Sequence, residues 1–154
     1  EKTSNSLDTV DEAALPQVNI KQSQIYALLK NIAGYNQIYR EAGAVHGCAV
    51  CKGPEILHFI EDIGRHNATD AIAGEMWLED IKGDDKWFYT TGRLTSEIVM
   101  KVASMDIPVL LSRSGITHMG LQLAEHLDVT LIARAKGRHF LVYSGKDNLT
   151  YDEA

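Results

Sequence analysis

The segment from Glu61 to Asp70 concentrates groups that could bind or transfer charge, since five of its ten residues carry a charge or an imidazole. It lies between an apolar run and a pattern with helical periodicity. We expect Asn67 to cap that helix, and Arg65 and His66 to lie near its N-terminus, where free backbone N–H groups and the helix dipole favour anions. Two interpretations stay open: an anion-binding site, or a capped loop whose charges are solvated.

Two further arginines stand in a similar context. Like Arg65, both Arg93 and Arg113 directly follow an expected strand and precede an expected helix. Other basic residues follow a fourth expected strand: Arg134, Lys136 and Arg138. Because ligands of open α/β sheets bind outside the carboxyl ends of the strands, we expect these guanidinium groups to line one edge and to bind phosphates or another polyanion. The alternative is that arginine is simply common in polar loops.

The two cysteines, Cys48 and Cys51, form a Cys-x-x-Cys pair with three interpretations. A zinc site would use both cysteines, His46 and a distant fourth ligand, although no second Cys-x-x-Cys pair exists and no structural metal is expected. A persulfide or disulfide-exchange site needs only the pair, and His46 and Lys52 could lower a thiol pKa. Alternatively, both are small buried side chains. Residues three apart in a straight strand face opposite sides, so the sulfurs could meet only if the chain bends.

Composition narrows the function classes. The chain has 154 residues and a net charge of −6, which argues against nucleic-acid binding through a broad basic surface. No run approaches the roughly 20 apolar residues that cross a bilayer, so no membrane association is expected. Two cysteines do not make a disulfide scaffold, which favours a reducing compartment and a cytoplasmic location.

The elements that would position these groups alternate along the chain. A helix is expected over 19–39, then a hairpin of strands 44–50 and 56–60. Helices and apolar strands follow in turn up to a last strand over 139–143. This order predicts an α/β fold of three α/β/α layers around a mostly parallel mixed sheet.

The sequence predicts a single folded domain. We expect a flexible N-terminal segment over 1–18, an α/β domain over 19–145 and a C-terminal tail over 146–154. Three apolar residues near a loop could serve a homodimer interface: Trp77, Leu78 and Trp87.

Several segments together resemble one family, the formate dehydrogenase accessory sulfurtransferases (FdhD). The matching segments, which are in order and cover roughly 43–145, are 43–46 with 61–68, 91–97, 107–114 and 138–143. The resemblance implies a cytidine-deaminase-like domain and a sulfur carrier for formate dehydrogenase. A cysteine desulfurase would load a persulfide, and the sulfur would pass to the molybdenum bis-molybdopterin guanine dinucleotide cofactor.

The resemblance also implies roles for individual residues. Cys48 and Cys51 would be the sulfur carriers. The cofactor, which contains guanine nucleotides, would be held by Arg65, His66, Arg93, Arg113, Phe140, Leu141, Val142, Tyr143, Ser144 and Gly145. In the family the sulfur-bearing pair lies in a glycine-flanked loop further upstream, with an N-terminal half before the domain. We expect this sequence to contain no counterpart of that upstream loop or of the family's N-terminal half.

Two other function classes remain. One is a binding and escort module for the molybdenum cofactor or a guanine nucleotide, with no covalent chemistry. The other is an enzyme that acts on free nucleotides. A zinc deaminase would need a glutamate two residues after His46 and a later Pro-Cys-x-x-Cys segment. Cys48 stands at the first of these positions, and no cysteine follows Cys51.

Overall fold

The structure is a computed structural model that describes residues 18–35, 46–62 and 64–153, apart from the side chains of Arg65 and His66. Its helices are α2 (Gln22–Tyr35), α4 (Arg65–Leu78), α5 (Ser96–Ser104), α6 (His118–Leu127) and the 3₁₀ turn η1 (Lys146–Asn148). Its strands are β1 (Ile20–Lys21), β2 (His46–Lys52), β3 (Glu55–Asp62), β4 (Trp87–Thr90), β5 (Val109–Ser112), β6 (Thr130–Lys136), β7 (His139–Ser144) and β8 (Leu149–Thr150).

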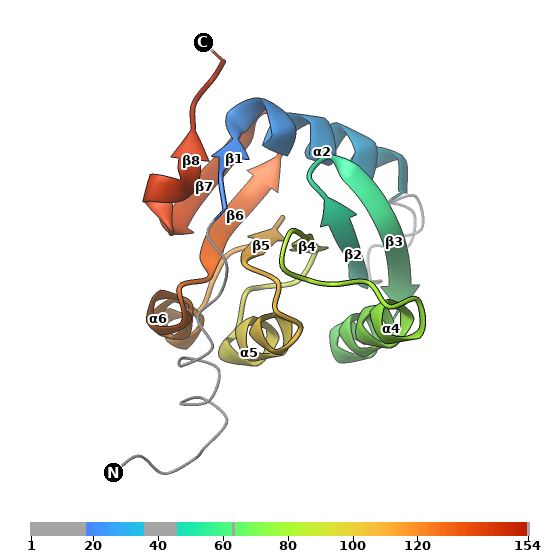
Figure 1. Cartoon of the computed structure of the whole chain (residues 1–154). Coiled ribbons are helices and arrows are strands. Elements are labelled where there is room, and N and C mark those ends of the chain that lie inside the picture. Colours follow the sequence, from blue (N-terminus) through green and yellow to red (C-terminus); the bar gives the residue numbers. More distant parts are fainter. Residues whose placement is uncertain (1–17, 36–45, 63, 154) are drawn as a thin grey trace, which may run out of the picture.

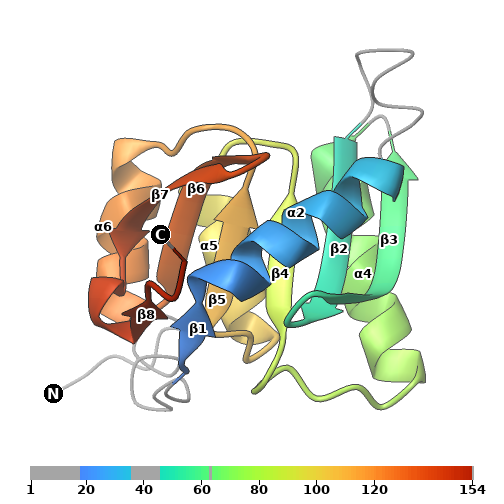
Figure 2. The same cartoon turned by 90° about the horizontal axis from the view of Figure 1, so that it is seen from above.

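The main sheet has the order β3-β2-β4-β5-β6-β7. The central strands β4, β5 and β6 are parallel, while β2 is antiparallel to both β3 and β4, and β7 is antiparallel to β6. As a result, β3 to β6 all run in one direction. Helix α2 covers one face of the sheet, and α4, α5 and α6 cover the other (Figures 1 and 2). The predicted three-layer α/β fold with a mixed sheet is confirmed.

Each face of the sheet has its own apolar core. On β2, Cys48 and Val50 pack on the side of α4 to α6, whereas Ala49 and Cys51 pack on the side of α2. The central strand β5 likewise sends Leu110 to one core and its two apolar neighbours to the other. Continuous apolar strands are therefore needed here, because helices cover both faces.

The expected interface residues separate in the structure. Trp77 and Leu78, at the end of α4, are 83% and 73% exposed. Trp87 is only 5% exposed and packs in the α2-side core. Its place among the candidate interface residues is thus wrong, because the first residue of a central strand is covered by α2.

The predicted hairpin of β2 and β3 is confirmed, and it contains a β-bulge. Val50 pairs with His58 and Cys51 pairs with Ile56, so Leu57 is an extra residue on β3. A bulge changes which side chains face each side of a sheet. Consistently, Leu57 and Ile60 pack on the α4 side, while Ile56 and Phe59 pack on the α2 side.

Side-chain capping differs between the two helices α5 and α4. The Oγ1 of Thr95 accepts a hydrogen bond from the Ile98 N–H and caps α5. Asn67 does not cap α4, because the helix already begins at Arg65 and Gly64 is the N-cap. Asp62 Oδ1 accepts the Gly64 N–H at 3.0 Å, which fixes the turn before the helix and leaves Asn67 inside the first helical turn.

The segment expected as a C-terminal tail contains η1 and β8. Strand β8 pairs in parallel with β1, and the Asp152 carboxylate accepts hydrogen bonds from Ser23 N at 2.9 Å and Ser23 Oγ at 2.6 Å. These contacts join the end of the chain to the start of α2. Of the expected N-terminal segment, 1–17 lie outside the described residues. Among the described helices, none has the length and apolar character needed to span a bilayer.

Candidate anion-binding site

The carboxyl ends of β3 to β6 lie along one edge of the sheet, and the predicted arginines follow these ends. Arg93 is exposed in the loop before α5, and Arg113 is half-buried in the loop before α6. Arg65 and His66 begin α4, after β3, but their side chains lie outside the described residues. The backbone therefore brings these positions to a common edge, while their roles in binding stay predictions.

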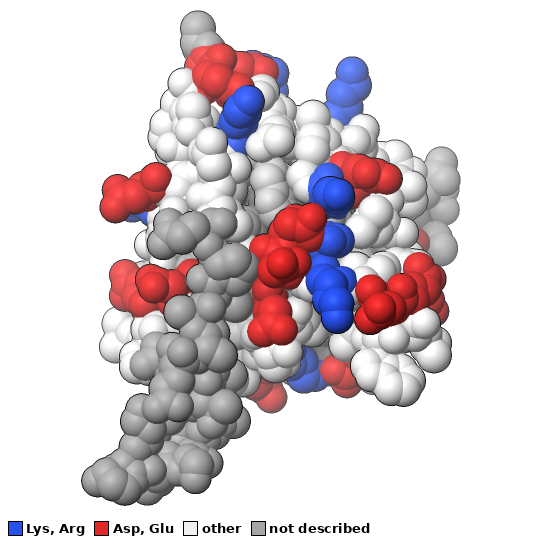
Figure 3. All heavy atoms as spheres, in the orientation of Figure 1, with Lys and Arg blue, Asp and Glu red and all other residues white. Residues whose placement is uncertain are grey.

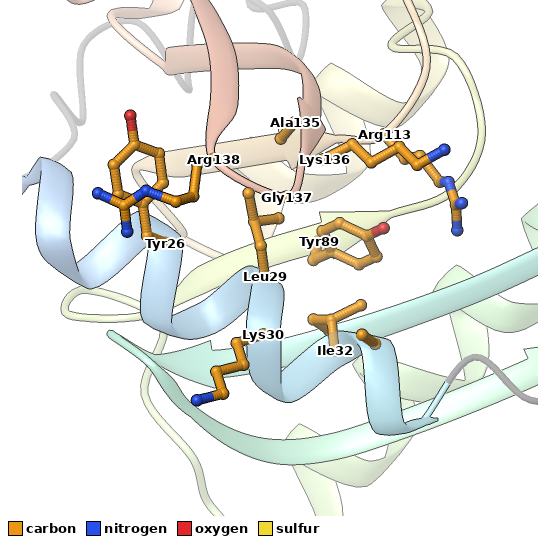
Figure 4. A pocket seen from close by; sticks show the side chains of 11 residues that line it. Tyr26, Leu29, Lys30, Ile32, Tyr89, Arg113, Ala135, Lys136, Gly137 and Arg138 are labelled. Carbon is orange, nitrogen blue, oxygen red and sulfur yellow. The ribbon is translucent and has the colours of Figure 1, made fainter.

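A cavity of about 520 Å³ lies between α2 and this edge of the sheet (Figure 4). Its apolar wall consists of Leu29, Ile32 and Ala33 from α2 and Ala135 from β6. Tyr89 of β4 also lines it, although only 2% of that residue is exposed. A volume of this size suits a small molecule or one arm of a larger one, since ligand cavities are typically about 300–1,000 Å³.

The charged side chains of the cavity have one sign. They are Lys30, Arg113, Lys136 and Arg138, and no described lining residue is Asp or Glu. This is notable in a chain whose net charge is −6. On the face of the molecule that Figure 3 shows, acidic and basic side chains lie next to one another. The cavity therefore has a local excess of positive charge next to an apolar and aromatic wall, which suits an anionic ligand with a planar ring.

Arg138 is held at the rim of the cavity by two contacts. Its guanidinium carbon lies 4.4 Å from the centroid of the Tyr26 ring, and its Nη2 pairs with the Glu153 carboxylate. Figure 4 shows Arg138 and Tyr26 together at one end of the cavity and Arg113 and Lys136 at the other. The basic groups are thus spread along the cavity rather than gathered at one point.

A second bulge, on β6, positions the turn between β6 and β7, which carries Arg138. Ala133 pairs with Leu141 and Lys136 pairs with His139, so two residues of β6 face one of β7. Within the bulge, Arg134 has a left-handed backbone (φ 54°) and donates its N–H to Ser114 O at 2.9 Å. Its guanidinium lies against Gly115, where an added Cβ would be 2.9 Å from Nη2. Arg134 therefore does not line the cavity, whereas the next four residues do.

The predicted cofactor-binding segment lies on the last strand of the sheet and does not line the cavity. Phe140 packs against Tyr26 and Tyr151, Val142 packs in the α2-side core and Tyr143 packs in the other core. Leu141 is 43% exposed, Ser144 is buried, and Gly145 has φ 79°. The structure thus brings Arg113 to the cavity. Arg93 and the segment 140–145 do not line it.

The two cysteines are buried and cannot meet. Both have 0% exposure, and they belong to the two different cores on either side of β2. Side chains that point to opposite faces cannot form a disulfide or share one metal ion without movement of the backbone. Both thiols are free in the structure.

The environment of each cysteine favours the neutral thiol. Burial raises the pKa of Cys51 from 9.0 to about 12. Burial also raises the pKa of Cys48, although its Sγ lies 3.6 Å from the Oγ1 atoms of Thr69 and Thr90, which partly offset that effect. Because thiolates are the nucleophiles in sulfur chemistry, neither cysteine is activated in this conformation.

Sequence reasoning missed the contribution of α2 to this cavity. Tyr26 and Lys30 were expected only as parts of a helix, and Tyr89 only as part of a strand. The available signal was weak: a lysine directly after buried Leu29, and tyrosines among apolar residues.

Comparisons with known proteins agree with this architecture. The FdhD/NarQ family model matches residues 1–150. The sulfur carrier protein FdhD of Listeria monocytogenes serotype 4b (strain F2365) is 34% identical over 141 residues, which cover 86% of this chain and 54% of that protein. The sulfur carrier protein FdhD of Bacillus subtilis (strain 168) is 30% identical over 138 residues, which cover 90% of this chain and 53% of that protein.

A solved structure supports the same relationship. The crystal structure of a protein from Desulfotalea psychrophila, assigned as a formate dehydrogenase accessory protein, superimposes with a TM-score of 0.82 at 29% identity, covering 92% of this chain and 62% of the other. This chain spans about half the length of the curated relatives it matches. Because the family model covers nearly all of its residues, the chain belongs to the FdhD/NarQ family.

Proposed function

We propose that this chain is the client-binding domain of a sulfur carrier that serves the maturation of formate dehydrogenase. The client is the molybdenum bis-molybdopterin guanine dinucleotide cofactor, and one guanine nucleotide arm of it enters the cavity between α2 and the sheet. The observation that carries the proposal is the cavity's charge: four cations and no described carboxylate line it.

The chemistry of the cavity matches such an arm in two respects. Arg113, Lys136 and Arg138 can donate charge-assisted hydrogen bonds to a diphosphate. The apolar wall of the cavity offers a surface against which a base or pterin ring can pack. A cavity of about 520 Å³ accommodates one nucleotide-sized arm, so the rest of the cofactor would extend beyond it.

The sulfur-transfer step is assigned to neither Cys48 nor Cys51. In such a step, a carrier thiolate takes the terminal sulfur of a desulfurase persulfide and leaves the donor as a thiol. Both cysteines of this chain are buried with raised pKa values, so they lack the access and the charge that the step needs. The proposal therefore assigns ligand binding, and not sulfur carriage, to the described residues.

Calorimetric titration with guanosine 5′-diphosphate tests the binding site. We expect the double variant Arg113→Gln/Lys136→Gln to bind at least tenfold more weakly than the parent chain, because hydrogen bonds to charged groups contribute about 1.5–3 kcal/mol each. The matched control is Lys82→Gln/Lys146→Gln, which removes the same charge from exposed residues outside the cavity. Equal affinities for the parent and the cavity variant would overturn the proposal, as would a lack of binding.

Titrations with two further ligands distinguish the contribution of the base to the affinity from that of the phosphates. Adenosine 5′-diphosphate and inorganic pyrophosphate carry the same anionic group, and we expect both to bind more weakly than the guanine nucleotide.

The mass of the intact protein after incubation with a cysteine desulfurase and cysteine tests the sulfur-transfer step. A reductant-sensitive gain of one sulfur that disappears in Cys48→Ala or Cys51→Ala would contradict the assignment of binding alone.

A further inference from the structure

A second cluster of polar side chains lies away from the cavity, on the opposite face of the sheet. It consists of His58 on β3 and of Glu75 and Glu79 on α4, with one potential ligand atom from each within 4.8 Å of the other two. The His58 Nε2 lies 3.1 Å from Glu79 Oε1. The side chain of His58 is 23% exposed and that of Glu79 is 50% exposed, so an ion from solvent could reach the cluster.

The bulge in β3 brings His58 to this face. Ile56 packs on the α2 side, so uninterrupted alternation would also turn His58 toward α2. The extra residue Leu57 shifts the alternation by one position, and His58 instead meets Glu79 of α4. Bulges re-aim side chains in this way and are common next to functional sites.

The helix supplies two carboxylates on the same face. Glu75 and Glu79 are four residues apart in and just beyond α4, where residues at this spacing are neighbours. Two like charges at this distance are unfavourable unless a cation compensates them. Within the described part of the chain, His58 is the partner of Glu79, and no lysine or arginine forms an ion pair with Glu75 or Glu79.

We propose that His58, Glu75 and Glu79 form a binding site for a divalent transition-metal ion of the Zn²⁺ class. Zinc binds imidazole nitrogen and carboxylate oxygen at about 2.0–2.2 Å, which separates neighbouring ligand atoms by about 3.0–3.4 Å in tetrahedral or octahedral geometry. The 3.1 Å between His58 Nε2 and Glu79 Oε1 fits this separation. The ligand atom of Glu75 lies within 4.8 Å of those of His58 and Glu79, within reach of an ion bound between the three side chains.

The donor set also favours one class of ion. An imidazole ligand suits zinc, copper, iron or nickel, whereas Mg²⁺ and Ca²⁺ prefer sites built from oxygen alone. Three protein ligands leave at least one coordination position for water. This site uses no residue of the cavity, so it is independent of the proposed nucleotide binding.

Titration of the complete chain with ZnCl₂, and with MgCl₂ for comparison, tests the site. We expect one equivalent of Zn²⁺ to bind, with affinity at least tenfold weaker in His58→Gln, Glu75→Gln and Glu79→Gln, and with little binding of Mg²⁺. Bound Zn²⁺ should also raise the thermal unfolding midpoint of the parent chain.

Matched controls exclude a general effect of charge or histidine content. His118→Gln and Glu125→Gln change exposed residues of α6, and both should bind Zn²⁺ like the parent. Unfolding midpoints without metal establish that each variant is folded. Zinc affinity that is the same in the parent and in the three site variants would overturn the proposal, and so would an absence of zinc binding by the folded parent.

Discussion

The guanidinium of Arg138 lies over the ring of Tyr26, 4.4 Å from its centroid, and this contact joins the β6–β7 turn to α2 across the rim of the cavity. The same guanidinium pairs with Glu153, whose backbone N–H donates to Gln22 Oε1 at 2.9 Å. The end of the chain therefore occupies one side of a cationic group that faces the cavity. A bound phosphate would compete with Glu153 for Arg138.

Replacement of Glu153 should strengthen binding of anions. Glu153→Gln removes the competing carboxylate but keeps the side-chain size, and we expect the affinity for guanosine 5′-diphosphate to rise about two- to threefold, since exposed ion pairs contribute little. The measurement is a calorimetric titration. Glu125→Gln on α6 is the control with the same change in net charge, and an equal gain in both variants would contradict a specific role of Glu153.

The native cysteines should resist modification. At pH 8 we expect neither Cys48 nor Cys51 to react rapidly with a thiol reagent, whereas both should react in guanidinium chloride. For Cys51, a pKa of about 12 rather than 9.0 lowers the thiolate fraction about a thousandfold, and burial adds a barrier to access. Time-resolved mass spectrometry measures the modification. Rapid labelling of either cysteine in the folded chain would contradict the protection of that thiol by burial.

Cys51 should also make stability decrease at alkaline pH. The folded state holds the thiol proton up to a pKa of about 12, while the unfolded chain releases it near 9.0. The unfolded state therefore binds fewer protons above pH 9, and the stabilisation from Cys51 is complete below pH 9 and is lost as the pH rises toward 12. Cys51→Ala removes this dependence, although it is less stable at neutral pH because it leaves a cavity.

Urea unfolding under reducing conditions at pH 7, 9 and 10.5 measures this effect. The stability deficit of Cys51→Ala relative to the parent should shrink by about 1–2 kcal/mol between pH 9 and 10.5, because one pKa unit corresponds to about 1.4 kcal/mol. Val50→Ala is the matched control, a cavity variant of the neighbouring buried residue, and its deficit should not change with pH. Parallel pH profiles for the two variants would refute the argument.

The layered fold follows largely from local patterns in the sequence. Ile107 to Leu111 is apolar without alternation, which predicts a strand covered on both faces, and the glycine and proline after Lys52 predict the hairpin turn. The placement of Arg93 and Arg113 after strands with a common direction also follows from element order. These features depend on neighbours in the sequence, where periodicity is informative.

The cavity could not be predicted in the same way. It depends on where α2 crosses the sheet, which brings Lys30 to the same cavity as Lys136, and on a bulge that separates Arg134 from the cavity. Bulges leave no clear pattern of residue types, so the alternation rule fails where they occur. The cysteine pair illustrates the opposite case: the rule that residues three apart face opposite sides holds, and Cys48 and Cys51 are in separate cores.

Two glycines in helices should respond to alanine with opposite signs. At Gly120 in α6, an added Cβ would lie 2.3 Å from the Leu94 carbonyl oxygen, so the helix and the β4–α5 loop could not stay in contact. Gly120→Ala should destabilise the fold by about 1–3 kcal/mol, as expected for overpacking. At Gly74 in α4, nothing lies within 4 Å of the added Cβ.

Gly74→Ala should therefore stabilise the fold by about 0.5–1 kcal/mol, because alanine has the higher helix propensity and nothing obstructs it. Urea unfolding of both variants measures the two effects, with the same chemical change in each. The difference in sign arises only from the packing of α6 against the Leu94 loop, since both glycines are inside helices. Equal stabilisation by both alanines would mean that this loop is not held against α6 at the distance described.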